Sequence, residues 1–274
     1  MITVNCGPCD SPAVKNLSTE AMIGRRMIHP LRAALLDIGG TLWPNSWPVR
    51  ATDGEGRLAR LRTVLPHEPP EKTAQLAQDL IEKSRDLNGG TVMIPELIRI
   101  DADDLITMCL GDHQVPITPG TVAQVRRAMA IPIDGTFKPL PGAVELLATI
   151  HELGLRCVIA SNTYWRDAQS YWDDLELLGM RQYVDAVVTS VDAGHLKPHP
   201  AVFELSVRAA GVPAAQCVMI GNKEANDIEP ALAMGMRAIL VYPDDPPPAS
   251  SRADAVAPDL WKCALALTAM LGRE

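Results

Sequence analysis

Short apolar runs alternate with longer mixed stretches along most of the chain from Leu31 onward. Runs rich in Val, Ile, Leu and Ala are typical of strands that are buried on both faces of a parallel sheet. We predict five of them, over residues 32–40, 155–162, 183–190, 216–222 and 238–243. Between the later strands we predict helices over residues 141–154, 199–212 and 226–236. Strands that alternate with helices of this length indicate an α/β fold with a doubly wound, Rossmann-like parallel sheet.

The segment from residue 45 to residue 135 breaks this alternation. It contains stretches with helical spacing and no strand of comparable quality, the helical stretches being residues 71–87, 101–111 and 118–130. We therefore predict that an all-helical domain, residues 45–135, is inserted after the first strand. The α/β core then consists of residues 31–44 and 136–274.

Both ends of the chain lie outside the alternating pattern. Residues 1–30 are expected to form an N-terminal tail, and they lack the charged start and apolar stretch of a secretory signal, so we expect a cytoplasmic protein. Cys6 and Cys9 form a Cys-Gly-Pro-Cys sequence like that of thioredoxins, but no βαβ pattern surrounds it, so we predict no redox role. Residues 244–257 predict a loop, and residues 258–271 predict a final helix.

The composition narrows the classes of protein to consider. Hydrophobic residues make up 47% of the chain and charged residues 21%, which is typical of a globular protein. The net charge is −8 and no basic stretch offsets it, so we expect no nucleic-acid partner. No apolar run has transmembrane length, so we expect no membrane partner. Four of the six cysteines are scattered singly and do not form a disulfide framework. Nothing in the sequence indicates an oligomeric state.

Three polar residues come at the ends of predicted strands. Asp37, Ser161 and Asn222 each follow an apolar run. In a parallel sheet, ligands bind outside the carboxyl ends of the strands, so we expect these side chains to share one site. Each of them alone has an ordinary structural explanation, such as a turn residue or a helix N-cap. Trp43 and Tyr171, which lie near these strand ends in the sequence, are interpreted as packing residues.

Four segments, in order along the chain, strengthen this interpretation. They are LLDIGGTLW (35–43), VIASN (158–162), GHLKPHPAVF (194–203) and MIGNKEANDIEPALAMGM (219–236). Together they resemble the four motifs of the haloacid dehalogenase-like (HAD) superfamily of hydrolases. The resemblance covers roughly residues 32–245, and the predicted helical insert corresponds to the cap domain of that superfamily. Because each motif alone is weak, the order of the four carries the resemblance.

The resemblance implies a phosphatase that acts on a small phosphorylated metabolite in two steps. Asp37 is the expected nucleophile, which forms an aspartyl-phosphate and so divides a difficult displacement into two easier ones. Lys197 is expected to offset the negative charge shared by Asp37 and the phosphate. The residues expected to bind the phosphate or shape the turn around it are Ser161, Asn162, Gly40 and Lys197.

The resemblance also implies a Mg²⁺ site, with Asp37, the Gly39 carbonyl, Asn222 and Asp227 as ligands. Two of these positions depart from the family pattern. Gly39 stands where most of these phosphatases have an Asp that serves as general acid and base, and its loss typically costs about 10²–10⁴-fold in rate. Asn222 stands where the fourth motif usually has Asp, so it brings an oxygen ligand without a charge. Glu224 is a nearby acid that would compensate if it reached the site.

These departures leave alternatives open. A leaving group that needs little protonation, such as an acyl or glycosyl phosphate, would tolerate Gly39. The dehalogenase branch of the superfamily also lacks the second Asp and needs no metal, but it usually has an aromatic residue at the position of Gly39. Phosphonatase-type chemistry would need a buried lysine from the insert, where Lys72 and Lys83 lie. A catalytically impaired protein that acts by binding or assembly is the alternative from a different functional class.

Overall fold

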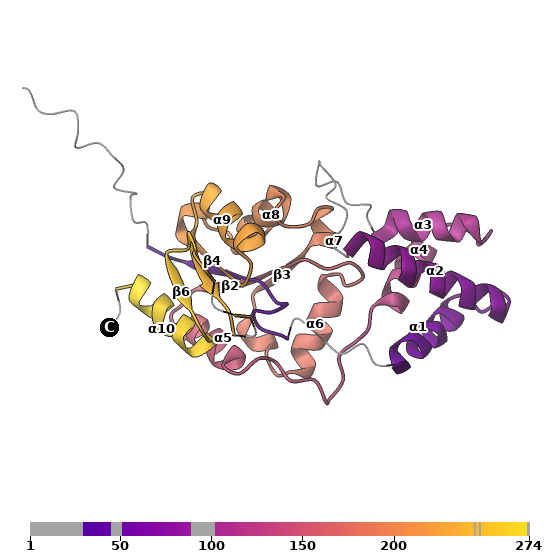
Figure 1. Ribbon diagram of the computed structural model, residues 1–274, viewed down its shortest axis with the longest axis horizontal. Coiled ribbons are helices and arrows are strands. Elements are labelled where there is room, and N and C mark those ends of the chain that lie inside the picture. Colours follow the sequence, from indigo (N-terminus) through magenta and orange to yellow (C-terminus); the bar gives the residue numbers. More distant parts are fainter. Residues whose placement is uncertain (1–29, 45–50, 89–101, 244, 247, 273–274) are drawn as a thin grey trace, which may run out of the picture.

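The computed structural model describes residues 30–44, 51–88, 102–243, 245–246 and 248–272. Cys6, Cys9 and the rest of the predicted tail up to residue 29 lie outside the described residues. The centre of the molecule is a parallel sheet with the strand order β3-β2-β1-β4-β5-β6 (Figure 1). The strands are β1 (Ala33–Leu36), β2 (Arg156–Ser161), β3 (Ala186–Thr189), β4 (Cys217–Gly221), β5 (Arg237–Val241) and β6 (Ala255–Ala257).

Helices cover both faces of this sheet, so the predicted doubly wound α/β fold is confirmed. All four residues of β1 are buried, because alternate side chains pack into different cores. Ala34 and Leu36 belong to the core under α5, α6 and α10, whereas Ala33 and Leu35 belong to the core under α8 and α9. Figure 1 shows these two groups of helices on opposite sides of the strands. The core helices are α5 (Ala143–Glu152), α6 (Ala168–Leu177), α7 (Ser190–Ala193), α8 (Pro200–Ala210), α9 (Glu229–Ala233) and α10 (Leu260–Met270).

Three shorter helical turns occur in the described part of the core, and one of them contributes to the site. They are η2 (Arg181–Tyr183), η3 (Ala214–Gln216) and the π-helical turn η4 (Glu224–Ile228). The predicted helix over residues 226–236 is therefore a π-helical turn followed by α9. Single π-turns are rare and often occur at functional sites.

The strand β6 was predicted as part of a loop, and that prediction was wrong. Ala255–Ala257 pairs in parallel with β5, and Val256 on this edge strand remains 45% exposed. Asp254 fixes the pairing, because Ala238 N donates to its carboxylate at 2.8 Å and its own N–H donates to the Ala238 carbonyl at 2.9 Å. A strand of three residues is too short to show a periodicity that sequence patterns could detect.

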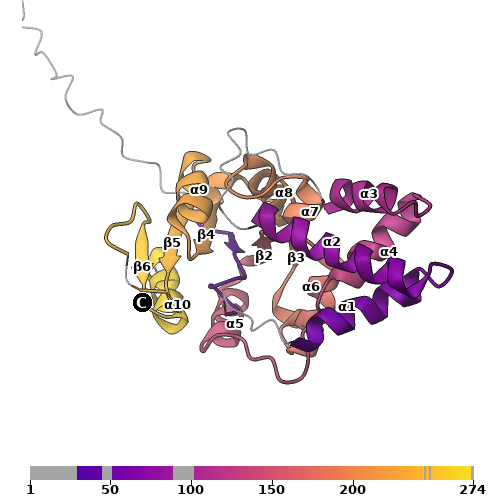
Figure 2. The ribbon, with the colours of Figure 1, turned by 45° about the vertical axis from the view of Figure 1, so that its right-hand side comes forward.

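The helical insert follows β1 and comprises α1 (Ala51–Val64), α2 (Pro70–Asn88), α3 (Ala102–Asp112) and α4 (Pro119–Met129). Figures 1 and 2 show these four helices grouped beside the sheet and not over its faces. They enclose a separate hydrophobic cluster that includes Leu61, Leu76 and Ile106, and Tyr164 and Trp165 from the segment after β2 also belong to this cluster. No helix among the described residues has the length and apolar character needed to cross a membrane.

The sequence pattern missed α1, which contains Gly54 and Gly56 and so has poor intrinsic helix propensity. Tertiary contacts compensate. Arg60 donates from Nε to the Ala128 carbonyl and from Nη2 to the Ala130 carbonyl, both at 2.9 Å. Arg57 donates from Nε to the Met129 carbonyl at 2.8 Å. These bonds satisfy carbonyls at the C-terminus of α4, where positive charge is also favoured by the helix dipole.

The strand order places β1 between β2 and β4, and this arrangement positions the site. The chain leaves β1, passes through the insert, and returns to β2 on one side, whereas β4 pairs with β1 on the other side. The carboxyl ends of these three strands therefore lie next to one another. In doubly wound sheets such a switch point is where ligands bind.

Candidate active site

Three charged side chains meet at the carboxyl ends of β1 and β4. Asp37 follows β1, and its backbone N–H donates to the Ile220 carbonyl of β4 at 2.9 Å. Lys197 Nζ donates to Asp37 Oδ1 at 2.7 Å and to Asp227 Oδ1 at 2.6 Å. All three side chains are buried. Because an isolated buried charge is very unfavourable, each member of this triad depends on the others.

The electrostatics of the triad keep the lysine charged. Burial lowers the pKa of Lys197, but the charges of Asp227 and Asp37 outweigh that effect and leave its pKa raised. Burial raises the pKa of Asp227, and Lys197 opposes that shift only in part. With both carboxylates ionised, the three groups carry one net negative charge. This excess favours a further cation at the site.

Asn162 holds the backbone of Lys197. Its Nδ2 donates to the Lys197 carbonyl at 2.9 Å, and the Lys197 N–H donates to its Oδ1 at 2.7 Å. Both polar atoms of the Asn162 amide therefore bind the backbone of Lys197 and hold it beside the end of β2. That Asn162 contacts substrate stays a prediction.

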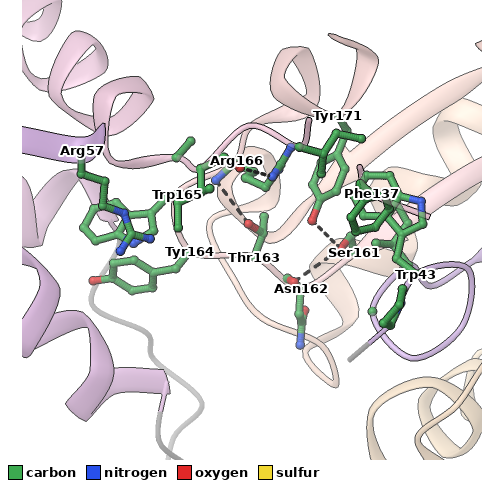
Figure 3. A pocket seen from close by; sticks show the side chains of 16 residues that line it. Trp43, Arg57, Phe137, Ser161, Asn162, Thr163, Tyr164, Trp165, Arg166 and Tyr171 are labelled. Carbon is green, nitrogen blue, oxygen red and sulfur yellow. Dashed lines mark hydrogen bonds between the residues drawn. The ribbon is translucent and has the colours of Figure 1, made fainter. Parts of the chain in front are cut away.

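Ser161 is the last residue of β2 and is buried. Its Oγ lies 3.1 Å from the Tyr171 hydroxyl of α6, a pair that Figure 3 shows as a dashed line. It also donates to the Asn162 carbonyl at 3.4 Å. From the sequence, Tyr171 was interpreted only as a packing residue. It lies ten residues after Ser161, and a separation of that length does not indicate a contact between the two side chains.

The turn after Asp37 is built on a glycine. Gly40 has a φ of 76°, which favours glycine, and its N–H donates to the Trp43 carbonyl at 2.7 Å. The turn places Thr41 so that its Oγ1 donates to Asp37 Oδ2 at 3.2 Å. Thr41 is fully buried and was not among the predicted site residues. Gly39, by contrast, does not have a positive φ, so its backbone conformation does not require glycine.

The loop after β4 brings Asn222 and Asp227 to the same edge of the sheet. Asp227 Oδ2 accepts from Lys223 N at 3.0 Å, which closes the π-helical turn over the strand end. Gly221 makes this approach possible, because a Cβ at that position would lie 2.5 Å from side-chain atoms of Asp227. Asn222 Nδ2 donates to Asp245 Oδ2 at 2.9 Å, a partner that sequence reasoning did not identify.

The oxygen atoms at this edge fit a magnesium ion. Asn222 Oδ1 is buried and has no hydrogen-bond partner in the part of the chain that the structure describes. Since a buried acceptor without a partner is unfavourable, this atom is suited to a ligand such as a cation. The carboxylates of Asp37 and Asp227 provide further oxygens of the kind that Mg²⁺ prefers. No cluster of three or more His, Cys, Asp or Glu side chains that could hold a metal occurs among the described residues, so a cation here would need the Asn222 amide oxygen beside the two carboxylates.

Glu224 does not serve as the compensating acid. Its Oε2 accepts from Ser251 Oγ at 2.7 Å, and its Oε1 accepts from Arg252 N at 2.7 Å. Glu224 therefore binds the loop that precedes β6, whereas Asp37 and Asp227 both bind the ammonium group of Lys197 at the strand ends. The carboxylates at the candidate metal site are those of Asp37 and Asp227.

Two histidines that flank Lys197 in the sequence have a structural role. The rings of His195 and His199 are stacked with their centroids 3.8 Å apart. His199 is the N-cap of α8, and its Nδ1 accepts from Ala201 N at 3.2 Å. The lysines of the insert are also accounted for, since Lys72 pairs with Glu68 and Lys83 pairs with Asp112 near the surface.

A cavity of about 270 Å³ opens beside these residues, between the core and the helical insert. Gly39, Ser161 and Asn162 belong to its wall, so it begins at the candidate site. In Figure 3, Ser161 and Asn162 mark the end of β2. Trp43, Phe137 and Tyr171 lie on one side of these two residues, and Tyr164, Trp165 and Arg57 lie on the other. Arg166 crosses the junction, where it donates to the Ile131 carbonyl at 2.5 Å and forms an ion pair with Asp174.

Comparison with proteins of known sequence supports a family assignment. A family model described as haloacid dehalogenase-like hydrolase matches residues 31–235. Haloacid dehalogenase-like hydrolase domain-containing protein 3 of Xenopus laevis is 36% identical over 108 residues, which are 39% of this chain and 43% of that protein. Glyceraldehyde 3-phosphate phosphatase of Methanothermobacter thermautotrophicus is 36% identical over 105 residues, which are 38% of this chain and 45% of that protein. The matches thus span about half the length of these curated relatives.

Solved structures support the same fold. A HAD phosphatase from Thermococcus onnurineus has a TM-score of 0.53 and 18% sequence identity, with coverage of 89% of this chain and 99% of that one. A 2-haloacid dehalogenase from Pseudomonas syringae pv. Tomato has a TM-score of 0.54 and 22% identity, with coverage of 86% and 99%. Since identities this low show the fold alone, the assignment depends on the family match, which spans well over half of the chain. This chain belongs to the haloacid dehalogenase-like hydrolase family.

Proposed function

We propose that the protein is a magnesium-dependent phosphatase that acts on a small phosphorylated substrate. The observation that carries this proposal is the position of Asp37, buried against Lys197 at the end of β1 with Ser161 at the end of the adjacent strand. Curated relatives named as glyceraldehyde 3-phosphate phosphatase and ribulose-1,5-bisphosphate 5-phosphatase also support it.

In the first step an Asp37 oxygen attacks phosphorus, and the leaving group departs with the electron pair of its P–O bond. Lys197 holds Asp37 in place through Oδ1 and balances the charge that the carboxylate shares with the phosphate. Ser161 Oγ would donate to a phosphoryl oxygen, and without substrate it lies 3.1 Å from the Tyr171 hydroxyl. Mg²⁺, when bound by Asp37, the Gly39 carbonyl, Asn222 and Asp227, supplies positive charge that stabilises the transferring group.

In the second step water attacks the phosphorus of the aspartyl-phosphate, which releases phosphate and restores the Asp37 carboxylate. Gly39 contributes no side chain to deprotonate that water or to protonate the leaving group of the first step. We therefore expect turnover to be slow for substrates whose leaving group is a poor one. A missing general acid costs about 10²–10⁴-fold.

The helical insert, residues 45–135, is proposed to act as a cap on the core of residues 31–44 and 136–274. Its inner side contributes Arg57 and Ala130 to the wall of the cavity, whereas Ser161 and Asn162 belong to the core. A substrate bound at the site would therefore contact both parts. We keep the prediction that the protein works in the cytoplasm.

The test is phosphate release from a panel of phosphorylated metabolites, acyl phosphates included, with Mg²⁺ and with a chelator. We expect release by the wild-type chain only with Mg²⁺, and loss of release in Asp37→Asn. Asp173→Asn is the matched control. It makes the same change at an exposed residue of α6 and should keep full activity. Release that persists in Asp37→Asn would overturn the proposal. No release from any compound would favour the alternative of a binding protein.

A further inference from the structure

Aromatic residues are scarce in this chain and concentrate at one place. The sequence has five tryptophans, four tyrosines and two phenylalanines. Five of these residues line the cavity that begins at the candidate site, namely Trp43, Phe137, Tyr164, Trp165 and Tyr171. They come from three separate segments of the chain, so no local feature of the sequence accounts for their meeting.

These side chains form rigid walls. Each is at most 9% exposed. On one side, the Trp43 ring lies edge-on to Phe137 at a centroid distance of 5.3 Å and tilted to Tyr171 at 5.6 Å. On the other side, Tyr164 and Trp165 meet at 4.7 Å with nearly perpendicular planes. Aromatic rings pack best in such offset and edge-to-face arrangements, which a planar ring of a ligand can extend.

The cavity borders two of the residues that we expect to bind the phosphate, Ser161 and Asn162. Gly39, Ser161 and Asn162 are part of its wall, and Asp37 immediately precedes Ile38, which also lines it. Asp37 itself does not line the cavity, but a substrate whose phosphate binds at Ser161 would have the rest of the molecule beside the aromatic walls. The volume of about 270 Å³ is close to the lower end of the range for small-molecule pockets.

The lack of a general acid at residue 39 also favours a leaving group that contains an aromatic ring. Gly39 offers no acid, so the departing oxygen must be stable as an anion. A phenol has a pKa of about 10, whereas the pKa of an aliphatic alcohol is far higher and close to that of water. The need for a general acid is thus much smaller for a phenolic leaving group than for an alkyl one.

We propose that the preferred substrate is an aryl phosphate, whose aromatic ring occupies the cavity lined by Trp43, Phe137, Tyr164, Trp165 and Tyr171. This inference rests on the proposed phosphatase function. An Asp37 oxygen forms a bond to phosphorus, the bond between phosphorus and the aryl oxygen breaks, and the electron pair leaves as phenoxide, which takes a proton from water. Water then attacks phosphorus, the Asp37–phosphorus bond breaks, and phosphate and the proton from water are released.

The first experiment compares four substrates with the wild-type chain and Mg²⁺. Phenyl phosphate has the ring and the good leaving group, benzyl phosphate has the ring with an alkyl oxygen, and cyclohexyl phosphate has neither feature at a similar size. Acetyl phosphate has a good leaving group without a ring. We expect kcat/KM for phenyl phosphate to exceed that for cyclohexyl phosphate by about 100-fold or more, since no acid assists the alkyl oxygen. We also expect the KM for benzyl phosphate to lie below that for cyclohexyl phosphate.

The outcomes separate this inference from the function on which it rests. Hydrolysis of acetyl phosphate that needs Mg²⁺ and Asp37, without a preference for phenyl over cyclohexyl phosphate, would leave the phosphatase intact and overturn the aryl substrate. If none of the four compounds releases phosphate, both the aryl phosphate substrate and the phosphatase function are overturned.

Binding provides a readout that does not depend on leaving-group chemistry. Calorimetry with Mg²⁺ should show phenylphosphonate binding about two- to tenfold more tightly than cyclohexylphosphonate, the range expected for one aromatic contact. Phe137→Leu and Trp165→Leu should remove that difference, and Trp261→Leu, which changes a half-exposed residue on α10, should retain it. Equal affinity of the two phosphonates for the wild-type chain would contradict the proposal, even if a cavity variant fails to fold.

Discussion

At the scale of single residues, the site depends on one buried ammonium group between two carboxylates. Lys197 contacts Asp37 and Asp227 at 2.7 and 2.6 Å and is only 3% exposed. The same residue that would balance charge during phosphoryl transfer therefore also stabilises the folded state. Asn162 fixes it through its backbone and not through its side chain.

Lys197→Met should reduce the free energy of unfolding by about 3–5 kcal/mol, because it leaves two buried carboxylates without their partner. Urea unfolding followed by circular dichroism measures this. Lys83→Met is the matched control, since Lys83 pairs with Asp112 at 3.1 Å while 40% exposed. An exposed pair contributes about 1 kcal/mol or less. Equal losses in the two variants would show that the triad does not stabilise the fold.

Gly39→Asp should widen the range of leaving groups. The backbone of Gly39 does not have a positive φ, so its conformation is one that Asp can adopt. A carboxyl group there would restore a general acid, and we expect the rate for cyclohexyl phosphate to rise about tenfold or more. The ratio of rates for cyclohexyl and phenyl phosphate is the measurement. A ratio unchanged by the substitution would mean that the missing acid does not limit the reaction.

At the scale of elements, tertiary contacts decide where propensity is weak. Helix α1 contains Gly54 and Gly56, and the strand β6 has only three residues. Neither stands out in the pattern of apolar positions. Helix α1 is stabilised by its arginines, which donate to the last carbonyls of α4. The strand β6 is stabilised by the two hydrogen bonds between Asp254 and Ala238.

Arg60→Met should loosen the junction of α1 and α4. It removes the donors to the Ala128 and Ala130 carbonyls, and hydrogen bonds from a charged group contribute about 1.5–3 kcal/mol each at most. Hydrogen exchange in the last turn of α4 should become about tenfold faster or more. Arg62→Met, an exposed position on the same helix, serves as the comparison and should leave exchange unchanged. Identical exchange in both variants would contradict this account of α1.

At the scale of the whole molecule, the proposed metal site would link the ends of strands that are distant in sequence. Asp37 follows β1, and Asn222 and Asp227 follow β4. A cation bound between them would favour the folded sheet over the unfolded chain, in which these oxygens are far apart.

Mg²⁺ at about 100 times its dissociation constant should stabilise the fold by about 2.7 kcal/mol. For a chain of this size that corresponds to a rise in Tm of about 5–10 °C. Differential scanning calorimetry with Mg²⁺ and with a chelator measures the shift. Asp227→Asn should abolish the Mg²⁺-dependent part, whereas Asp173→Asn should keep it. A Tm that does not respond to Mg²⁺ in the wild-type chain would exclude this site as a magnesium site of useful affinity.

The amino-acid sequence is sufficient to predict the fold class and the strands β1 to β5, because buried parallel strands are continuous apolar runs that can be recognised locally. It also placed Asp37, Ser161 and Asn222 at strand ends, and sheet geometry brings such ends together. The tertiary structure alone decided the contacts between side chains: Tyr171 with Ser161, Asp245 with Asn222, and the bonds of Glu224 to residues 251–252. It also gathered five aromatic residues around one cavity. These contacts join distant segments through packing, for which a single sequence carries no periodic signal.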